Sequence, residues 1–274
     1  SAAQQHEPDL ILFSPKNIAG VHFAEKLNIP AVSALLFPQF VPTGEFPALG
    51  FPKLFQSAGY NRSSYRVVRK ISGLLGGRPL KNWRKENGLP PAFCGIDVCH
   101  DSSGNSIPVV NGYSASLVPS PPDWPDSVRT SGFWFLERPG DWSPPDDLLS
   151  FLAAGPPPVY VGFGSMASSR SKKVTDIVVS ALSKSGVRGI IATGWGGLDA
   201  DHCADTIFRT DSVPHDWLFP RVSAVVHHGG AGTTAAGLRA GCPTLVCPIF
   251  GDQPFWGKVV HDLGAGAKPI YQKN

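Results

Sequence analysis

The sequence has 274 residues, of which 42% are hydrophobic and 16% are charged, and its net charge at pH 7 is +3. Its 27 prolines and 30 glycines indicate many loops, but their sum stays below the share expected of a disordered or low-complexity chain. No apolar run is long enough to span a bilayer, and the small net charge gives no reason to expect nucleic acid as a partner.

Short apolar runs alternate with helical patterns at the start of the chain, as in βαβ units on a parallel sheet. The pattern predicts a buried strand over Asp9–Phe13, a helix over Ile18–Leu27 and a second strand over Ala31–Phe37. The sequence then becomes rich in proline and aromatic residues up to about residue 140. Only two further strands are predicted in that stretch, Tyr113–Val118 and Gly132–Leu136.

One segment of this first part, Arg62–Lys85, carries eight basic residues and no acidic one. Apolar residues recur at helical spacing along it, namely Tyr65, Val68, Ile71 and Leu75. The pattern predicts a basic amphipathic helix, which has two interpretations. It could make a peripheral contact with an anionic membrane, or it could be a solvated helix that covers a cleft of its own domain.

A proline-rich connection, Leu136–Pro158, contains one short helix candidate and separates two predicted domains, 1–140 and 141–274. After it the alternation becomes regular. Strands are predicted at Val159–Phe163, Arg188–Thr193, Thr206–Arg209, Ala224–His228 and Thr244–Pro248, and helices at Lys172–Ser183, Gly232–Ala240 and Pro254–Leu263. Parallel strands with short crossovers of this kind form a doubly wound sheet.

The segment Val225–Gln253 is the most informative about chemistry. Its strand ends at His227 and His228, and the glycine-rich turn that follows leads into a helix at Thr233. Ligands of open α/β sheets bind beyond the carboxyl ends of the strands, and a helix N-terminus offers free N–H groups to a phosphate. The segment therefore predicts a diphosphate site. In the alternative interpretation the glycines only turn the chain and Thr233 only caps the helix.

Two further segments fall at the same predicted edge of the sheet. Gly162, Gly164 and Ser165 form a second glycine turn between a strand and a helix. Asp252 and Gln253 follow another strand, and a carboxylate beside an amide offers both acceptors and donors to sugar hydroxyls. Asp252 could equally serve as the cap of the helix that follows it.

The motifs VPHDWLF, HHGGAGTT and FGDQPFWG, within Val213–Gly257, closely resemble those of the UDP-glycosyltransferases, and in particular of their sterol 3-β-glucosyltransferase branch. The stretches GPPPVYVGFGSM and IIATGWGGL fit that branch, and SPKNIAGVHFAEKLNIP extends the resemblance more loosely into the first domain. The resemblance implies an α/β fold of the GT-B type with two facing Rossmann-like domains. It also implies that this chain begins around the middle of the N-terminal domain and stops before the last helices of the C-terminal one.

The resemblance also implies roles for individual residues. His228 would contact the donor diphosphate together with backbone groups of Gly230, Gly232, Thr233 and Thr234, and Ser165 would be a second phosphate contact. The backbone of Val213 would pair with uracil, and Asp252 and Gln253 would hold the transferred glucose. His215 and Trp217 lie in the same motif set, but we expect Trp217 to pack in the core.

The implied reaction is transfer of glucose from UDP-glucose to the hydroxyl of a sterol or similar lipid, with inversion and without metal or cofactor. The catalytic base is expected upstream of Ser1, because neither His6 nor His22 lies in a matching motif. Two alternatives stay open. The acceptor could be a polyketide, terpenoid or flavonoid, or the chain could be a nucleotide-sugar-binding fragment without activity.

The sequence also bears on metal binding and on the cellular compartment. The Asp199-Ala200-Asp201 pattern is one that metal-dependent transferases use, but it lies in a predicted surface loop without supporting ligands, so no metal site is expected. The five cysteines are scattered and form no Cys-x-x-Cys pair, which favours a reducing compartment and hence the cytoplasm.

Overall fold

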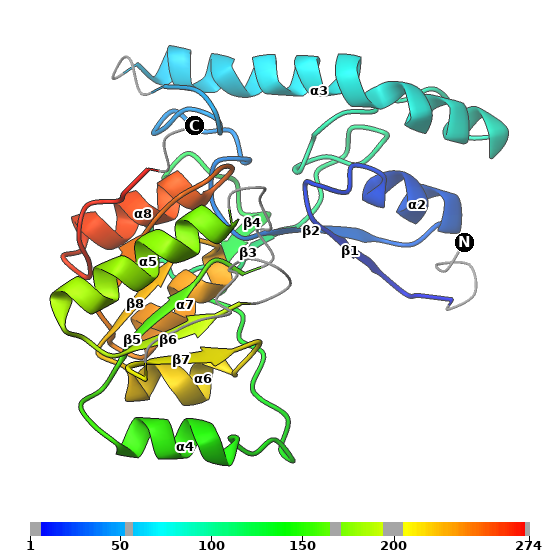
Figure 1. Cartoon of the computed structure of the whole chain (residues 1–274). Helices are drawn as coiled ribbons and strands as arrows, with labels where there is room; N and C mark the ends of the chain where they lie inside the picture. The colour runs from blue at the N-terminus through cyan, green and yellow to red at the C-terminus, as the bar shows by residue number, and fades with distance from the viewer. Residues whose placement is uncertain (1–6, 53–56, 165–170, 194–204, 272–274) are drawn as a thin grey trace. The chain divides into compact units, whose positions relative to one another are not determined.

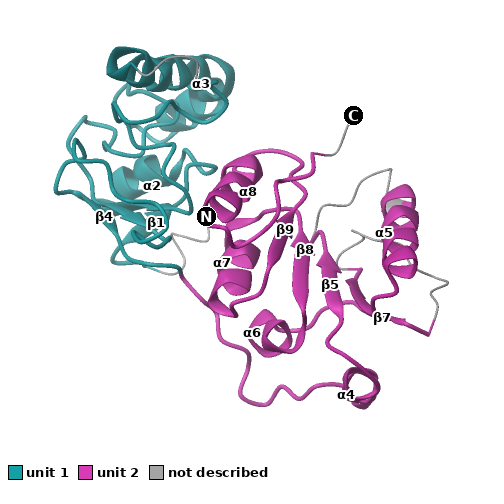
Figure 2. Ribbon diagram, turned by 90° about the vertical axis from the view of Figure 1, so that its left-hand side faces the viewer, with its two compact units in different colours: residues 1–133 teal, residues 134–274 magenta. Residues whose placement is uncertain are grey.

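The computed structural model describes residues 7–52, 57–164, 171–193 and 205–271. Contacts divide the chain into two compact units, Ser1–Phe133 (unit 1) and Trp134–Asn274 (unit 2) (Figure 2). The division falls a few residues before the boundary drawn from the sequence. None of the helices in the described ranges is long and apolar enough to cross a bilayer.

Unit 1 contains a four-stranded parallel sheet in the order β1-β2-β3-β4. The strands are β1 (Ile11–Phe13), β2 (Ala31–Leu35), β3 (Val109–Asn111) and β4 (Val128–Thr130). Buried apolar residues line the sheet, among them Phe13, Ala31, Leu35, Val109 and Val128. Helix α2 (Gly20–Leu27) packs against β1 and β2, and Asn28 ends it in the left-handed conformation with φ 55°.

Two of the strands predicted before residue 140 are wrong. Instead of Tyr113–Val118 the chain pairs through β3, a few residues earlier, because Leu117 N and Val118 N both donate to Ser114 O and close a turn. The second predicted strand, Gly132–Leu136, is replaced by β4, which lies a few residues earlier in the chain. Gly132 has a φ of +89°, which lies outside the range of a strand.

Helix α3 (Ala58–Glu86) is longer than the predicted Arg62–Lys85 and runs along unit 1 without interruption, despite Pro79 in its interior (Figure 1). The Ser57 hydroxyl caps it by accepting a hydrogen bond from Tyr60 N. Its last turn is fixed by Arg84, a buried side chain whose Nη1 lies 2.7 Å from His22 Nδ1 and whose Nε donates to Pro90 O at 3.0 Å. Arg84 also forms an ion pair with Glu25 on α2.

Unit 2 contains a five-stranded parallel sheet in the order β7-β6-β5-β8-β9. The strands are β5 (Val159–Gly162), β6 (Gly189–Ala192), β7 (Ile207–Thr210), β8 (Ala224–His227) and β9 (Thr244–Val246). Its helical elements are α4 (Asp146–Ala153), α5 (Ser171–Ser185), α6 (His215–Leu218), the 3-10 turn η1 (Phe219–Arg221), α7 (Ala231–Arg239) and α8 (Gln253–Asp262). The predicted strands and helices of this half are confirmed to within about two residues at each end.

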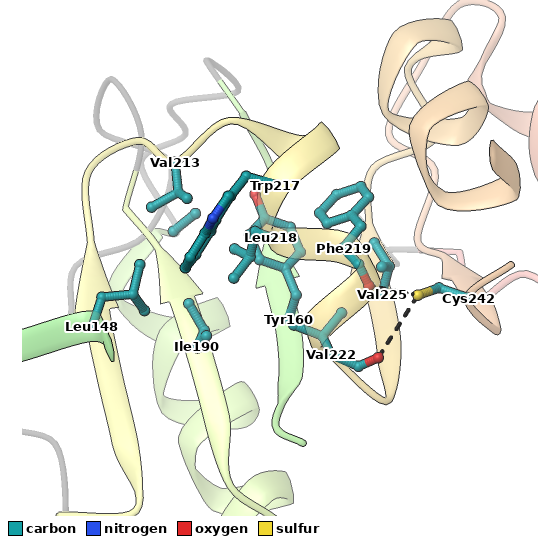
Figure 3. Packing of buried hydrophobic residues seen from close by; sticks show 11 residues of the cluster. Leu148, Tyr160, Ile190, Val213, Trp217, Leu218, Phe219, Val222, Val225 and Cys242 are labelled. Carbon is teal, nitrogen blue, oxygen red and sulfur yellow. Dashed lines mark hydrogen bonds between the residues drawn. The ribbon is translucent and has the colours of Figure 1, made fainter. Parts of the chain in front are cut away.

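Alternate residues of the strands in unit 2 enter two cores, because successive side chains point to opposite faces of a sheet. Tyr160, Ile190 and Val225 pack on one face with α4, α6 and η1, together with Cys242 (Figure 3). Val161 and Ile191 face the other side and pack against α5 residues such as Leu182. Trp217 is 7% exposed within the first of these cores, as predicted from the sequence.

Candidate functional site

The strand order of unit 2 reverses between β5 and β8. The chain leaves β5 toward β6 and β7 and then returns to build β8 and β9 on the other side of β5. Gly162 and His227, the last residues of β5 and β8, are register partners. The loops after these two strands therefore diverge from one point of the carboxyl edge, which is where open α/β sheets bind ligands.

A glycine turn connects β8 to α7. Gly229 has a φ of +95°, and a Cβ at this position would lie 2.6 Å from Val246 Cγ1 and 3.0 Å from Gln253 O. The N–H of Gly229 donates to Nδ1 of His227, at 2.9 Å. Only glycine satisfies both the backbone conformation and the close approach of β9 and α8 here.

The geometry of this turn predicts that Gly229→Ala destabilises unit 2. We expect it to lower the free energy of unfolding by about 2–3 kcal/mol, because strain at positive φ adds to a steric clash. Gly241→Ala is a matched control, since Gly241 also has a positive φ (+67°) but a methyl group added there would meet no atom within 4 Å. Urea unfolding of both variants measures the difference, and equal losses would contradict a packing requirement at Gly229.

His228 is half-buried between the two glycine turns. An ideal Cβ at Gly230 would lie 2.7 Å from its Nε2, and one at Gly164, which has a φ of +61°, would lie 3.3 Å from its Cε1. Burial lowers the pKa of His228, while the Asp252 carboxylate acts in the opposite direction. The ring is therefore neutral at pH 7, and its buried Nδ1 has no hydrogen-bond partner among the described residues.

His227, by contrast, is fully buried and its Nδ1 accepts the hydrogen bond of Gly229 N. Burial, with smaller contributions from His228 and His215, lowers the pKa of His227 to about 3. Of the two adjacent histidines, His227 holds the turn and His228 is the one available to a ligand.

Helix α7 begins beside His228 with Gly230 as its N-cap, where no side chain caps the helix. The first intrahelical bond runs from Thr234 N to Gly230 O at 3.0 Å. The N–H groups of Ala231, Gly232 and Thr233 precede that bond, so they have no acceptor within the helix. These donors and the positive end of the helix dipole suit an anion.

Thr234 differs from its expected role. It is fully buried, and its hydroxyl donates to Gly230 O at 3.0 Å, the same oxygen that accepts its N–H. Both of its donors are used within the helix, so we do not count Thr234 among the phosphate contacts proposed below.

Asp252 and Gln253 lie at the start of α8, on the loop after β9. Asp252 occupies the N-cap position, but its side chain makes no capping hydrogen bond. Gln253 is 5% exposed, and its Oε1 accepts from Ile249 N at 2.7 Å and from Phe250 N at 3.0 Å. The carboxamide oxygen thus shapes the loop, and the Nε2 group is the part of Gln253 that a ligand could use.

The remaining predicted residues either lie elsewhere in unit 2 or fall outside the described residues. Val213 lies on the loop after β7, with its side chain in the core. His215 stacks on Phe219 with ring centroids 4.3 Å apart, and burial lowers its pKa. Ser165, His6 and the Asp199–Asp201 pattern lie outside the described residues. In the described ranges, no group of three or more His, Cys, Asp or Glu side chains is placed to hold a metal ion.

A cavity of about 520 Å³ adjoins the N-terminal turn of α7. It is lined by Trp134, Phe135, Leu136, Glu137, His215, Asp216, Pro220, Gly232, Ala236, Arg239 and Ala240. Sequence reasoning did not identify Trp134–Glu137 as one of its walls. This segment is held by the ion pair of Arg239 with Glu137, at 3.0 Å, and by the guanidinium of Arg239 over the Phe135 ring.

Comparison with known proteins gives strong sequence matches. A sterol 3-beta-glucosyltransferase of Arabidopsis thaliana is 43% identical over 263 residues, covering 96% of this chain and 41% of the relative. One of Aspergillus oryzae is 38% identical and covers 96% of this chain and 20% of the relative. The chain is therefore similar in sequence to one part of each of these sterol 3-beta-glucosyltransferases. It spans less than half the length of either of these two relatives.

Other comparisons concern the fold. The family model of the erythromycin biosynthesis protein CIII-like C-terminal domain matches residues 162–273. Among solved structures, the glycosyltransferase of kitacinnamycin superposes with a TM-score of 0.66 at 20% identity, covering 98% of this chain and 65% of that one. SsfS6 of Streptomyces sp. SF2575, complexed with thymidine diphosphate, superposes with a TM-score of 0.55 at 17% identity, covering 98% and 59%.

These matches confirm the predicted fold class. The chain has an α/β fold with two Rossmann-like units, each built on a parallel sheet, as in GT-B glycosyltransferases. The roles of individual residues stay predictions, because none of these matches assigns a role to a residue of this chain.

Proposed function

We propose that unit 2 binds UDP-glucose at the carboxyl edge of its sheet and that the protein transfers the glucose to a sterol hydroxyl with inversion and without a metal ion. The observation that carries the donor site is the position of His228. Its imidazole, unpartnered among the described residues, lies between two glycine turns and beside the uncapped N-terminus of α7.

In this proposal the diphosphate lies against the first turn of α7. The N–H groups of Ala231, Gly232 and Thr233 and an N–H of the His228 ring donate to its oxygens, and Ser165 is a further contact. Because UDP leaves as an anion, fixed donors and a helix dipole stabilise the charge that develops on the leaving group. A neutral His228 serves here as a hydrogen-bond donor rather than as a fixed cation.

The nucleoside is assigned to the side of α7 where the cavity lies. Two aromatic side chains, Trp134 and Phe135, line that cavity together with Ala236, a small residue one turn along the helix from Gly232. Val213 is retained as the backbone partner of uracil. Asp252 and the Nε2 group of Gln253 are proposed to hold the glucose hydroxyls, since both residues face the same edge as His228.

The acceptor is proposed to be a sterol because the two relatives described above are named for sterols. No base is assigned within this chain. A base elsewhere would remove the proton of the acceptor hydroxyl as its oxygen attacks the anomeric carbon, and UDP would leave from the opposite face. The membrane contact predicted for Arg62–Lys85 is a separate proposal, because it concerns unit 1.

His228→Ala tests the donor site. We expect it to weaken UDP binding about 10- to 100-fold, the loss typical for a hydrogen bond to a charged group. Isothermal titration calorimetry with UDP measures the change. His261→Ala is the control, since His261 is an exposed histidine in the last turn of α8, and its affinity should equal that of the wild type.

Unchanged UDP affinity in His228→Ala would contradict the proposed site. A product assay with UDP-glucose and either a sterol or a flavonoid then tests the reaction. Glucosylated sterol supports the proposed transfer, and glucosylated flavonoid alone contradicts the acceptor class. UDP-glucose binding without transfer by this chain would favour a binding fragment.

A further inference from the structure

Helix α3 has two apolar faces, only one of which packs inside unit 1. On the inner face Tyr65 is 7% exposed and its hydroxyl donates to Phe46 O at 3.1 Å. Gly77 lies so close to the loop after α3 that a Cβ there would be 2.5 Å from Cys94 O. This inner face accounts for Tyr65 and Val68, two of the four apolar residues on which the amphipathic prediction rested.

The outer face carries a second apolar stripe. Val67, Ile71, Leu74 and Leu75 are 41%, 47%, 73% and 83% exposed. They are spaced by four, three and one residues, which places them within roughly 100° of the helix circumference. Figure 2 shows α3 at the edge of unit 1, with α2 and the sheet on one side of the helix. Leaving two adjacent leucines in water is unfavourable, and a solvated helix would not need them.

The basic residues of α3 divide between the same two faces. Arg62 pairs with Asp123 at 2.8 Å, Arg69 pairs with Asp97 at 2.9 Å, and Arg84 pairs with Glu25. Across the described part of the chain no carboxylate pairs with the other five, all exposed, which are Arg66, Lys70, Arg78, Lys81 and Lys85. These five basic residues lie on the same helix as the apolar stripe, and the one acidic residue of α3 is Glu86, its last residue.

We propose that the outer face of α3 is a docking surface for an anionic lipid bilayer. Leu74 and Leu75, with Val67 and Ile71, enter the boundary between headgroups and acyl chains, while Lys70, Lys81 and the other unpaired basic residues contact lipid phosphates and carboxylates. A narrow apolar stripe accompanied mainly by basic residues is the pattern of a helix that lies in the membrane interface.

The helix is already formed and fixed before it meets the membrane. Its first turns are held by the Arg62–Asp123 ion pair, its middle by the close approach of Gly73 and Gly77 to Phe93 and Cys94, and its end by Arg84. Docking therefore requires no folding of α3, which distinguishes this surface from peptides that become helical only on a bilayer. The proposal goes beyond the proposed transfer reaction and does not depend on the donor site.

Co-sedimentation of the full chain with vesicles tests the proposal. We expect binding to phosphatidylcholine vesicles that contain about 30% phosphatidylserine, little binding to phosphatidylcholine alone, and weaker binding as salt rises from about 0.1 to about 0.5 M. The double variants Leu74→Ser/Leu75→Ser and Lys70→Glu/Lys81→Glu should each reduce the partition coefficient at least about tenfold.

Unit 2 offers matched controls on α5, where Ile177 is 59% exposed and Lys173 is also exposed. Ile177→Ser and Lys173→Glu should bind vesicles like the wild type. All variants should keep the wild-type melting temperature, because the substituted side chains are exposed. The two α3 double variants should also keep the wild-type UDP affinity, because they lie in unit 1, far in sequence from the donor motifs. A loss of vesicle binding is thereby separated from misfolding and from any failure of the donor site.

The proposal is overturned if the wild type binds neither kind of vesicle, or binds both equally. It is also overturned if either double variant binds as the wild type does. If vesicles are not bound but Leu74→Ser/Leu75→Ser dissociates an oligomer in sedimentation velocity, the occupant of the stripe is a second copy of the chain rather than a membrane.

Discussion

Replacing Arg84 by alanine should destabilise unit 1 by about 3–5 kcal/mol, the cost expected when one partner of a buried ion pair is removed. Arg84 is 2% exposed, and its guanidinium serves Glu25, His22 and Pro90 O at once. Its hydrogen bonds are also the largest cause of the lowered pKa of Glu25. Without Arg84, the partly buried Glu25 carboxylate loses its cation and Pro90 O loses its donor.

Arg62→Ala is the matched control for this substitution. Arg62 is another arginine of α3 in an ion pair, but its side chain is 54% exposed, so its loss should cost less than about 1 kcal/mol. Urea unfolding followed by circular dichroism compares the two variants. A loss below about 1 kcal/mol in Arg84→Ala would mean that the cluster contributes no more than a surface pair and does not anchor α3.

Unit 2 could be predicted from the sequence almost element by element, and the reason is physical. Strands of a parallel sheet buried on both faces are continuous apolar runs, such as Val159–Gly162 and Ala224–His227. Glycine or proline follows most of them closely, and amphipathic helices lie between them. Local pattern and tertiary environment agree here, so the pattern is sufficient.

The strands β1 and β9, of three residues each, were predicted because they are mainly apolar. Unit 1 was predicted less well because its equally short strands β3 and β4 include polar residues. Such short runs carry little periodicity, and β3 ends in Asn111, a fully buried polar residue that hydropathy does not mark as a strand. Helix α3 was found, but its exposed face was not. The prediction assigned Tyr65, Val68, Ile71 and Leu75 to one face, whereas packing buries Tyr65, partly buries Val68 and exposes the last two.

The residues of the candidate site likewise differ in whether the local sequence could reveal them. The glycine turns and His228 carry local signals, because a strand, a turn with positive φ and a helix start follow one another directly. The aromatic wall at Trp134–Glu137 carries none. It depends on pairs such as Arg239 with Glu137, which are 102 residues apart in the sequence. The burial of the Thr234 hydroxyl likewise depends on which face of α7 meets the core.

Acid should destabilise both units well above the pH at which most carboxylates protonate. His22 in unit 1 and His227 in unit 2 are almost completely buried, and burial is the main cause that lowers their pKa values to about 4 and about 3. Because both values lie below the unfolded value of 6.5, the unfolded chain binds more protons. Their contribution is constant above pH 6.5 and falls as the pH is lowered toward the folded pKa.

At pH 5 each histidine should cost its unit about 2 kcal/mol relative to pH 7. His227→Asn provides the test, because the asparagine Oδ1 can replace Nδ1 as acceptor for Gly229 N but does not titrate. Whatever its stability at pH 7, this variant should lose about 2 kcal/mol less than the wild type between pH 7 and pH 5. His261→Asn, at an exposed histidine of α8, should retain the wild-type pH dependence. If His227→Asn and the wild type lose the same free energy of unfolding, a neutral buried His227 is not the source of the acid sensitivity.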